Sequence, residues 1–138
     1  MRSINGDISN AARLTARRRQ FDSILLTIRE VLHWLPIRQR VDYKLSVLVF
    51  NCLRNLAPSY LRNMCQSVTS NLHRRRLRSA VRGDLIVPPI KTVRYGPRSA
   101  GPSTWNAPPA PLRNDELSAV SFRRQLKTEL YIRAYYSH

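Results

Sequence analysis

The strongest periodic signal in the chain lies between residues 37 and 56, where apolar side chains recur at intervals of three and four. Its members are Val41, Leu45, Leu48, Val49, Cys52, Leu53 and Leu56. This spacing is typical of one face of an α-helix. Val47 and Phe50 lie off that face, so this helix is apolar on more than one side and is predicted to lie at the centre of the fold. Leu48 lies in the middle of the stripe. Its truncation to alanine is expected to lower the free energy of unfolding by about 2–5 kcal/mol.

Shorter helices are predicted before and after the central one. The first 20 residues are polar and basic and can form one short helix. A helix over residues 22–35 has a good capping residue at its start and ends at Pro36, because proline pushes the preceding residue out of the helical region. Its apolar stripe consists of Leu25, Ile28, Leu32 and Leu35. Pro58 can begin a further short helix through Leu61.

The last helix is predicted to begin near Asn114. Asp115 and Glu116 would lie in its first turn and Arg133 in its last, where each charge favours the helix dipole. The buried stripe of this helix is predicted to consist of Ala119, Phe122, Leu126 and Leu130.

The segment from 67 to 113 lacks a helical period. Leu85 to Val87 has strand composition, and a second extended piece contains Val93 and Tyr95. The pair Pro88-Pro89 confines these pieces to edge strands or a loose hairpin. The rest of the segment, GPRSAGPSTWNAPPAPLRN, is rich in proline and glycine and is predicted to be irregular, with Trp105 packed over the core.

These elements predict a mainly α protein, built as a small helical bundle with a short β-hairpin-like element near 85–95 and a Pro/Gly-rich loop. A length of 138 residues favours one domain. Four segments follow one another along the chain: a basic N-terminal segment (1–20), a helical core (21–66), a basic loop with short strands (67–113) and a C-terminal helix (114–138).

The net charge of the chain says more about its function than any sequence motif does. The chain carries 24 Lys and Arg residues against 8 Asp and Glu residues, a formal net charge of +16. Nearly all the cations are arginines, whose planar guanidinium can donate two parallel hydrogen bonds to a phosphate. The positive density peaks between residues 67 and 104, which hold eight cations and one acid. Non-specific binding of RNA or DNA is therefore expected.

The candidate nucleic-acid-binding residues are arginines clustered with an aromatic side chain. In this interpretation the arginines neutralise phosphates, and the aromatic ring can stack on an exposed base. The middle-loop set consists of Arg74, Arg75, Arg76, Arg78, Arg94, Tyr95 and Arg98. A second set, at the start of the central helix, consists of Arg38, Arg40 and Lys44.

Catalytic and metal-binding patterns are missing from the sequence. Two cysteines do not make a disulfide framework, and Cys52 is interpreted as a small core residue. The three histidines lie far apart, so neither a metal site nor a cofactor is expected. No Asp-Asp pair serves two-metal phosphoryl transfer, and no Gly-x-Ser-x-Gly elbow holds a nucleophile. No apolar run approaches the length of a membrane span, so no membrane association is expected.

Several stretches resemble the C-terminal region of reverse transcriptases from non-LTR (LINE-type, jockey-like) retrotransposons. They are NAARL, RRQFDSI, LHWLPIRQRVDYKLSVLVFNCLRNLAPSYL, LRSAVRGDLIVPPIKTVRYGPRS, GPSTWN and LSAVSFRRQLKTEL, and they run in family order from about Asn10 to Leu130. In that family the region follows the palm, in or beyond the thumb. The resemblance implies a polymerase fragment that helps to hold template RNA or target DNA and carries no catalytic residue, since the metal-binding and endonuclease motifs lie upstream.

The chain departs from the family pattern at one place. Family members usually have several more residues, one of them aromatic, between GPRS and GPSTWN, where this chain has Ala100 alone. After the tryptophan they usually read Asn-Ser-Leu-Pro, whereas this chain reads Asn106-Ala107-Pro108-Pro109. These changes are expected to remove apolar anchors from the loop that docks Trp105.

Three interpretations of function remain open at this point. The first is a non-catalytic, basic nucleic-acid-binding fragment of a reverse transcriptase, located in the nucleus or cytoplasm. The second is a relic open reading frame without a selected function, folding partly around the central helix. The third is a small adaptor whose exposed helices bind a protein partner. The oligomeric state is left open by the sequence.

Overall fold

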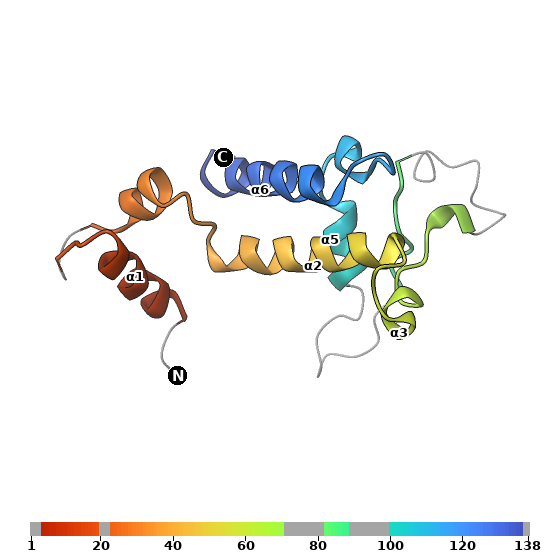
Figure 1. Ribbon diagram of the computed structural model, residues 1–138, viewed down its shortest axis with the longest axis horizontal. Coiled ribbons are helices and arrows are strands. Elements are labelled where there is room, and N and C mark those ends of the chain that lie inside the picture. The colour runs from red at the N-terminus through yellow and green to blue at the C-terminus, as the bar shows by residue number, and fades with distance from the viewer. Residues whose placement is uncertain (1–3, 20–22, 71–81, 89–99, 137–138) are drawn as a thin grey trace. The chain divides into compact units, whose positions relative to one another are not determined.

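The computed structural model describes residues 4–19, 23–70, 82–88 and 100–136, and these residues are mainly helical. The elements are α1 (Ile4–Thr15), a π-helical turn η1 (Thr27–Val31), α2 (Ile37–Leu53), α3 (Ser59–Arg62), the 3₁₀ turn η2 (Val68–Ser70), α5 (Ala100–Asn106), the 3₁₀ turn η4 (Ala110–Arg113) and α6 (Ala119–Tyr135) (Figure 1). The prediction of a mainly α protein is confirmed.

Contacts divide the chain into two compact units. The first contains Met1–Val41 with Leu130–His138, and the second contains Asp42–Glu129. Both α2 and α6 contribute residues to each unit. The four segments predicted from the sequence are consecutive stretches that differ in composition. The two units are instead defined by contacts, and the first unit combines an N-terminal and a C-terminal stretch of the chain.

The first unit is held together by a small apolar core and by tyrosine hydroxyls. Its core consists of Ala12, Ile24 and Ile28, with Ile8, Leu32 and Trp34 packed against it. The Tyr131 hydroxyl donates a hydrogen bond to the Arg29 carbonyl at 2.5 Å, and the Tyr135 hydroxyl donates one to the Trp34 carbonyl at 2.8 Å. One of these carbonyls lies in the π-helical turn and the other follows it, so the last turns of α6 satisfy backbone groups on both sides of the helix end.

The helix predicted over residues 22–35 is shorter than expected. Helical turns run only from Leu25 to Val31, and the chain leaves them at His33, whose φ of 47° lies in the left-handed region. The Trp34 N–H then bonds to the Ile28 carbonyl at 3.0 Å and closes the helix end. The helix therefore ends at a left-handed residue three positions before Pro36. Leu25, predicted to be buried, is exposed, and Ile24 is buried in its place.

The core of the second unit is built on aromatic contacts. The ring of Phe50 on α2 stacks on that of Phe122 on α6, with centroids 4.3 Å apart, and the Trp105 ring of α5 lies 5.7 Å from Phe122. Within this unit α2 and α6 lie side by side (Figure 1). A side chain built at Gly101 would meet Val49 at 3.4 Å, so α5 packs closely against α2. The predicted burial of Phe122, Leu126 and Leu130 on α6 is confirmed.

The buried face of α2 differs from the predicted stripe. The buried residues of α2 are Ser46, Val49, Phe50 and Cys52, whereas Leu48 is 39% exposed and Val41 and Leu56 are exposed too. The prediction that Leu48 lies at the centre of the core is wrong. Apolar residues occupy more than one side of this helix, and the aromatic ring of Phe50 determines which side faces α6.

Ser46 on α2 is fully buried, yet its hydroxyl has no hydrogen-bond partner among the described residues. An unsatisfied buried polar group costs free energy, and alanine is the better helix former. We expect Ser46→Ala to raise the free energy of unfolding by about 1 kcal/mol, measured by urea denaturation. Ser103→Ala, at an exposed position of α5, is the matched control and should gain only the propensity difference. A loss of stability in Ser46→Ala would contradict this account of the hydroxyl.

The segment around Leu85 is extended and pairs with a stretch that the sequence analysis did not consider. Leu85 forms an isolated antiparallel bridge with Ser67, supported by bonds from the Val68 N–H to the Asp84 carbonyl and from the Ile86 N–H to the Gln66 carbonyl. The described residues contain no named strand. The other half of the predicted hairpin, with Val93 and Tyr95, lies outside the described residues.

The proline- and glycine-rich stretch is more ordered than predicted. Residues 100–106 form α5, with Gly101 and Pro102 in its first turn, where a missing N–H costs no helical hydrogen bond. Trp105 is only 3% exposed, so its predicted packing over the core is confirmed. Pro108 and Leu112 are buried nearby in sequence. The expected loss of apolar anchors therefore does not expose the tryptophan.

Candidate functional site

The structure places only part of the predicted nucleic-acid-binding set. Arg38 and Lys44 are exposed on α2. Arg40 is half-buried, donates from Nε to the Leu35 carbonyl at 2.8 Å, and lies over the Trp34 ring at 5.3 Å. Arg40 therefore stabilises the corner before α2 rather than extending into solvent. The middle-loop set consists of Arg74, Arg75, Arg76, Arg78, Arg94, Tyr95 and Arg98 and lies outside the described residues.

A basic surface that the sequence analysis did not single out lies on α6. Arg123, Arg124 and Lys127 are all exposed there, whereas Phe122 and Leu126 on the same helix are buried. We call these three residues the α6 ridge. Arg123 and Lys127 are four residues apart, and positions i and i+4 share one helix face. This spacing could have identified the basic surface from the sequence. Regional charge counts dilute this signal, since Asp115, Glu116 and Glu129 are counted with it.

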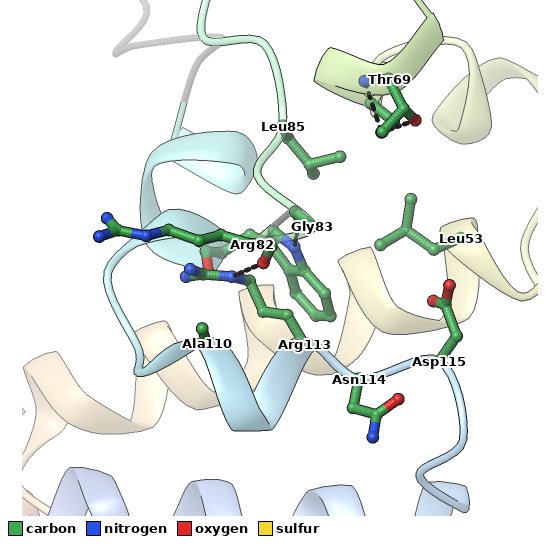
Figure 2. Close-up of a pocket in the computed structure, with 11 residues that line it drawn as sticks. Leu53, Thr69, Arg82, Gly83, Leu85, Ala110, Arg113, Asn114 and Asp115 are labelled. Carbon is green, nitrogen blue, oxygen red and sulfur yellow. Dashed lines mark hydrogen bonds between the residues drawn. The ribbon is translucent and has the colours of Figure 1, made fainter. Parts of the chain in front are cut away.

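A cavity of about 510 Å³ opens in the second unit beside α5 (Figure 2). Its apolar wall is formed by Leu53, Leu85 and Trp105, and Asn114 and Asp115 lie along another side. The hydroxyls of Ser67 and Thr69 also line it and are hydrogen-bonded to each other at 2.7 Å. The cavity thus combines an apolar wall with hydrogen-bonding groups, and its lining residues come from four separate stretches of the chain.

Arg113 organises the chain next to this cavity. Its guanidinium forms an ion pair with Asp84 at 2.9 Å, and only 5% of its side-chain surface is exposed. The same guanidinium donates to the carbonyls of Arg82 at 2.8 Å, Pro108 at 2.7 Å and Asn106 at 3.0 Å. Burial lowers the pKa of Arg113, and the charge of Asp84 opposes that shift. Because these donors are already used within the protein, Arg113 is a structural cation.

Trp105 and Asn106 hold the extended segment that contains Leu85. The Leu85 N–H donates to Asn106 Oδ1 at 2.8 Å, and Asn106 Nδ2 donates back to the Leu85 carbonyl at 2.9 Å. Trp105 Nε1 donates to the Gly83 carbonyl at 3.1 Å. An asparagine amide that pairs with both backbone groups of one residue replaces a neighbouring strand. We call this set of bonds the Trp-Asn clasp.

The cations of the described residues differ in what their side chains contact. Within the described ranges, no group of three or more His, Cys, Asp and Glu side chains is placed to hold a metal ion. Arg54, like Arg113, is engaged with backbone: its Nη2 donates to the Leu117 carbonyl at 3.1 Å, and its guanidinium lies over the Phe50 ring. The cations therefore divide into structural arginines and an exposed group that includes the α6 ridge.

Comparisons with protein-family models, with curated proteins and with solved structures find no match for this chain. None of the helices in the described part of the chain has the length and apolar character needed to cross a membrane.

Proposed function

We propose that this protein is a non-catalytic, basic nucleic-acid-binding protein derived from the C-terminal region of a non-LTR retrotransposon reverse transcriptase, acting in the nucleus or cytoplasm. The sequence resemblance, which extends over most of the chain in family order, supports the origin. The net charge of +16 supports the binding of RNA or DNA. Polymerase and nuclease activity are not part of the proposal, because the acidic motif that binds catalytic metal ions is missing from the sequence.

The observation that carries the binding proposal is the exposure of the α6 ridge. Arg123, Arg124 and Lys127 extend from a helix that Phe122 and Leu126 anchor in the core. Cβ atoms four residues apart on a helix are about 5–6 Å apart, so Arg123 and Lys127 form a continuous cationic strip. Cations fixed on a rigid helix neutralise phosphates and release counterions without reading the base sequence.

Neutralising the α6 ridge should weaken binding to mixed-sequence single-stranded RNA and DNA. We expect the variant with Arg123→Gln, Arg124→Gln and Lys127→Gln to bind about 10- to 100-fold more weakly at 150 mM salt. The slope of log affinity against log salt should fall by about two units, at about 0.7 per lost phosphate contact. Fluorescence anisotropy over a salt series measures both quantities.

The matched control removes the same charge elsewhere, through Arg17→Gln, Arg18→Gln and Arg19→Gln after α1. If the control loses as much affinity as the ridge variant, net charge alone governs binding and the ridge is not the interface. If neither variant loses affinity, Arg74→Ser with Arg75→Ser and Arg76→Ser tests the middle loop, which the sequence predicts to bind. Unchanged binding in all three variants would reject these basic surfaces as the interface.

A protein-binding adaptor is the second candidate. It is favoured by Leu56, Tyr60 and Met64, large apolar side chains that are exposed at intervals of four residues around α3. Salt distinguishes the two functions, because an interface built on apolar side chains changes little between 50 and 200 mM salt, whereas phosphate binding weakens steeply.

A further inference from the structure

A cluster of aromatic rings and one arginine lies at the C-terminal end of α6, within the first unit. The Tyr131 ring is at its centre, with its centroid 5.9 Å from that of the His33 ring and 6.2 Å from that of the Tyr136 ring. The Tyr135 ring lies 4.9 Å from Tyr131 as well. The Arg29 guanidinium lies 4.6 Å from the Tyr136 ring centroid and 5.8 Å from that of Tyr135. We call these five residues the Tyr-Arg cluster.

Hydrogen bonds to the backbone bring the two parts of this cluster together. Tyr131 and Tyr135 are one turn apart on the same face of α6. The hydroxyl of Tyr131 donates to the Arg29 carbonyl, and that of Tyr135 donates to the Trp34 carbonyl. Between these two carbonyls lies His33, whose left-handed φ of 47° is a conformation that histidine adopts more readily than most residues. The hydroxyls of Tyr131 and Tyr135 are therefore used within the protein.

Two rings of the cluster are exposed although both contact Tyr131. Tyr136 is 58% exposed, and His33 is exposed too. Because Arg29 covers one face of the Tyr136 ring, the exposed surface of this ring includes its opposite face. Ile132, which is one turn earlier on the same side of α6, is also exposed. The Tyr136 ring is thus held by a cation on one face and is open on the other, where a second flat ring can stack.

The charge of the first unit favours an anionic partner for these rings. The unit carries nine arginines and three acidic residues. Its exposed arginines include Arg17, Arg18, Arg19 and Arg38. Exposed aromatic rings among arginines suit unpaired nucleotides, because the rings stack on the bases while the cations neutralise the phosphates. The bases of a duplex are stacked on one another, so their faces are closed to such rings. The chemistry of the cluster therefore fits a single strand better than a duplex.

We propose that the Tyr-Arg cluster is a stacking site for unpaired bases of single-stranded RNA or DNA, with Tyr136 as its main ring and His33 as its second. This inference rests on the proposed nucleic-acid binding and adds a second site to it. The α6 ridge neutralises phosphates of any strand, whereas the cluster selects strands whose bases are unpaired.

Two properties of binding at this site follow from its geometry. Arg29 already packs on the Tyr136 ring, so stacking of a base orders little of the protein and costs little side-chain entropy. Every base has a flat π-face, so the cluster tolerates any base sequence and differs in this respect from a site that reads base edges.

Strands that carry the same charge with and without bases test the site. Fluorescence anisotropy compares a mixed-sequence single strand with an abasic strand of equal length, at the same salt concentration and with the full-length protein. The base-carrying strand should bind about 5- to 20-fold more tightly. Tyr136→Leu should lose most of this preference and leave the slope of log affinity against log salt unchanged, because no cation is removed. Tyr136→Phe keeps the ring and should keep the preference.

Two control variants separate the cluster from the other surfaces. Tyr60→Leu replaces another exposed tyrosine, on α3 in the second unit, and should keep the preference for base-carrying strands. The α6 ridge variant should bind both strands more weakly and keep the same preference. Equal binding of the two strands by the wild-type protein would reject the stacking site and leave the ridge proposal intact, whereas no binding of either strand would reject both. Equal losses in Tyr136→Phe and Tyr136→Leu would assign the effect to the hydroxyl and overturn the stacking site.

A measurement on the wild-type protein alone locates the stacked base and does not depend on the folding of variants. A single strand that carries bromouracil is irradiated in the complex, and the crosslinked peptides are identified by mass spectrometry after digestion with trypsin. The main adduct should lie in the peptide 134–138, which contains Tyr136, and a second in the peptide 30–38, which contains His33. Adducts confined to other peptides would overturn the proposal.

Discussion

Truncation of Phe122 to alanine is expected to lower the free energy of unfolding by about 3–5 kcal/mol. Phe122 is 1% exposed and joins α6 to α2 and α5, through its stack on Phe50 and its contact with Trp105. Removing the ring takes away the aromatic contacts and leaves a cavity that the surrounding helices can fill only in part. Urea denaturation followed by circular dichroism measures the change.

Val120→Ala and Leu48→Ala are the matched controls for this prediction. Val120 lies two residues away on α6 and is 78% exposed, so its truncation should cost less than about 0.5 kcal/mol. Leu48 lies on α2, where the periodicity alone had predicted a core position. Because Leu48 is partly exposed, Leu48→Ala is expected to lower the free energy of unfolding by only about 1 kcal/mol. A loss at Val120 equal to that at Phe122 would mean that α6 faces the core with its other side.

Replacing Arg113 with methionine should destabilise the protein by about 3–5 kcal/mol. The change leaves the Asp84 carboxylate, 18% exposed, without its partner and removes donors from the carbonyls of Arg82, Asn106 and Pro108. Losing one member of a buried ion pair costs more than losing both, because the remaining charge stays desolvated. Thermal unfolding measures the loss directly.

Two further variants isolate the ion pair from the loss of packing. Adding Asp84→Asn to Arg113→Met should recover part of the lost stability, since no unpaired charge remains. Arg82→Met, at an exposed position lining the same cavity, should change stability by less than about 0.5 kcal/mol. A double variant no more stable than Arg113→Met would show that the carbonyl bonds, and not the charge of Asp84, account for the loss.

The helices were predictable where one face alone is apolar. On α6, Phe122, Leu126 and Leu130 are buried as their spacing predicts. On α2 the same reasoning was right for Val49 and Cys52 and wrong for Leu48, because several faces carry apolar residues and contacts with other helices decide among them. Because Asp115 and Glu116 are favourable in a first helical turn, the sequence predicts a start of α6 that is five residues too early, at Asn114. Its Oδ1 instead accepts from the Glu116 N–H within a turn, and Ser118 accepts from the Ser121 N–H as the true cap.

The site was less predictable than the fold, for a physical reason. Charge counts treat every arginine alike, whereas Arg40, Arg54 and Arg113 donate to backbone carbonyls and Arg123 and Arg124 are exposed. Which arginine meets a carbonyl depends on where loops run, and loop paths leave no period in the sequence. The partner of Asn106 was hidden for the same reason, since Leu85 lies more than ten residues away from it.

The Trp-Asn clasp determines how well folding tolerates insertions and deletions in the chain between Leu85 and Trp105. Trp105 and Asn106 bond directly to Gly83 and Leu85, so the two ends of the stretch between them are held in place by the clasp itself. The cost of closing a chain grows only with the logarithm of its length, by about 0.6 kcal/mol per doubling. Insertions and deletions between residues 88 and 100 are therefore expected to cost little folding free energy, because the clasp holds the extended segment at Leu85 and the helix α5 together directly.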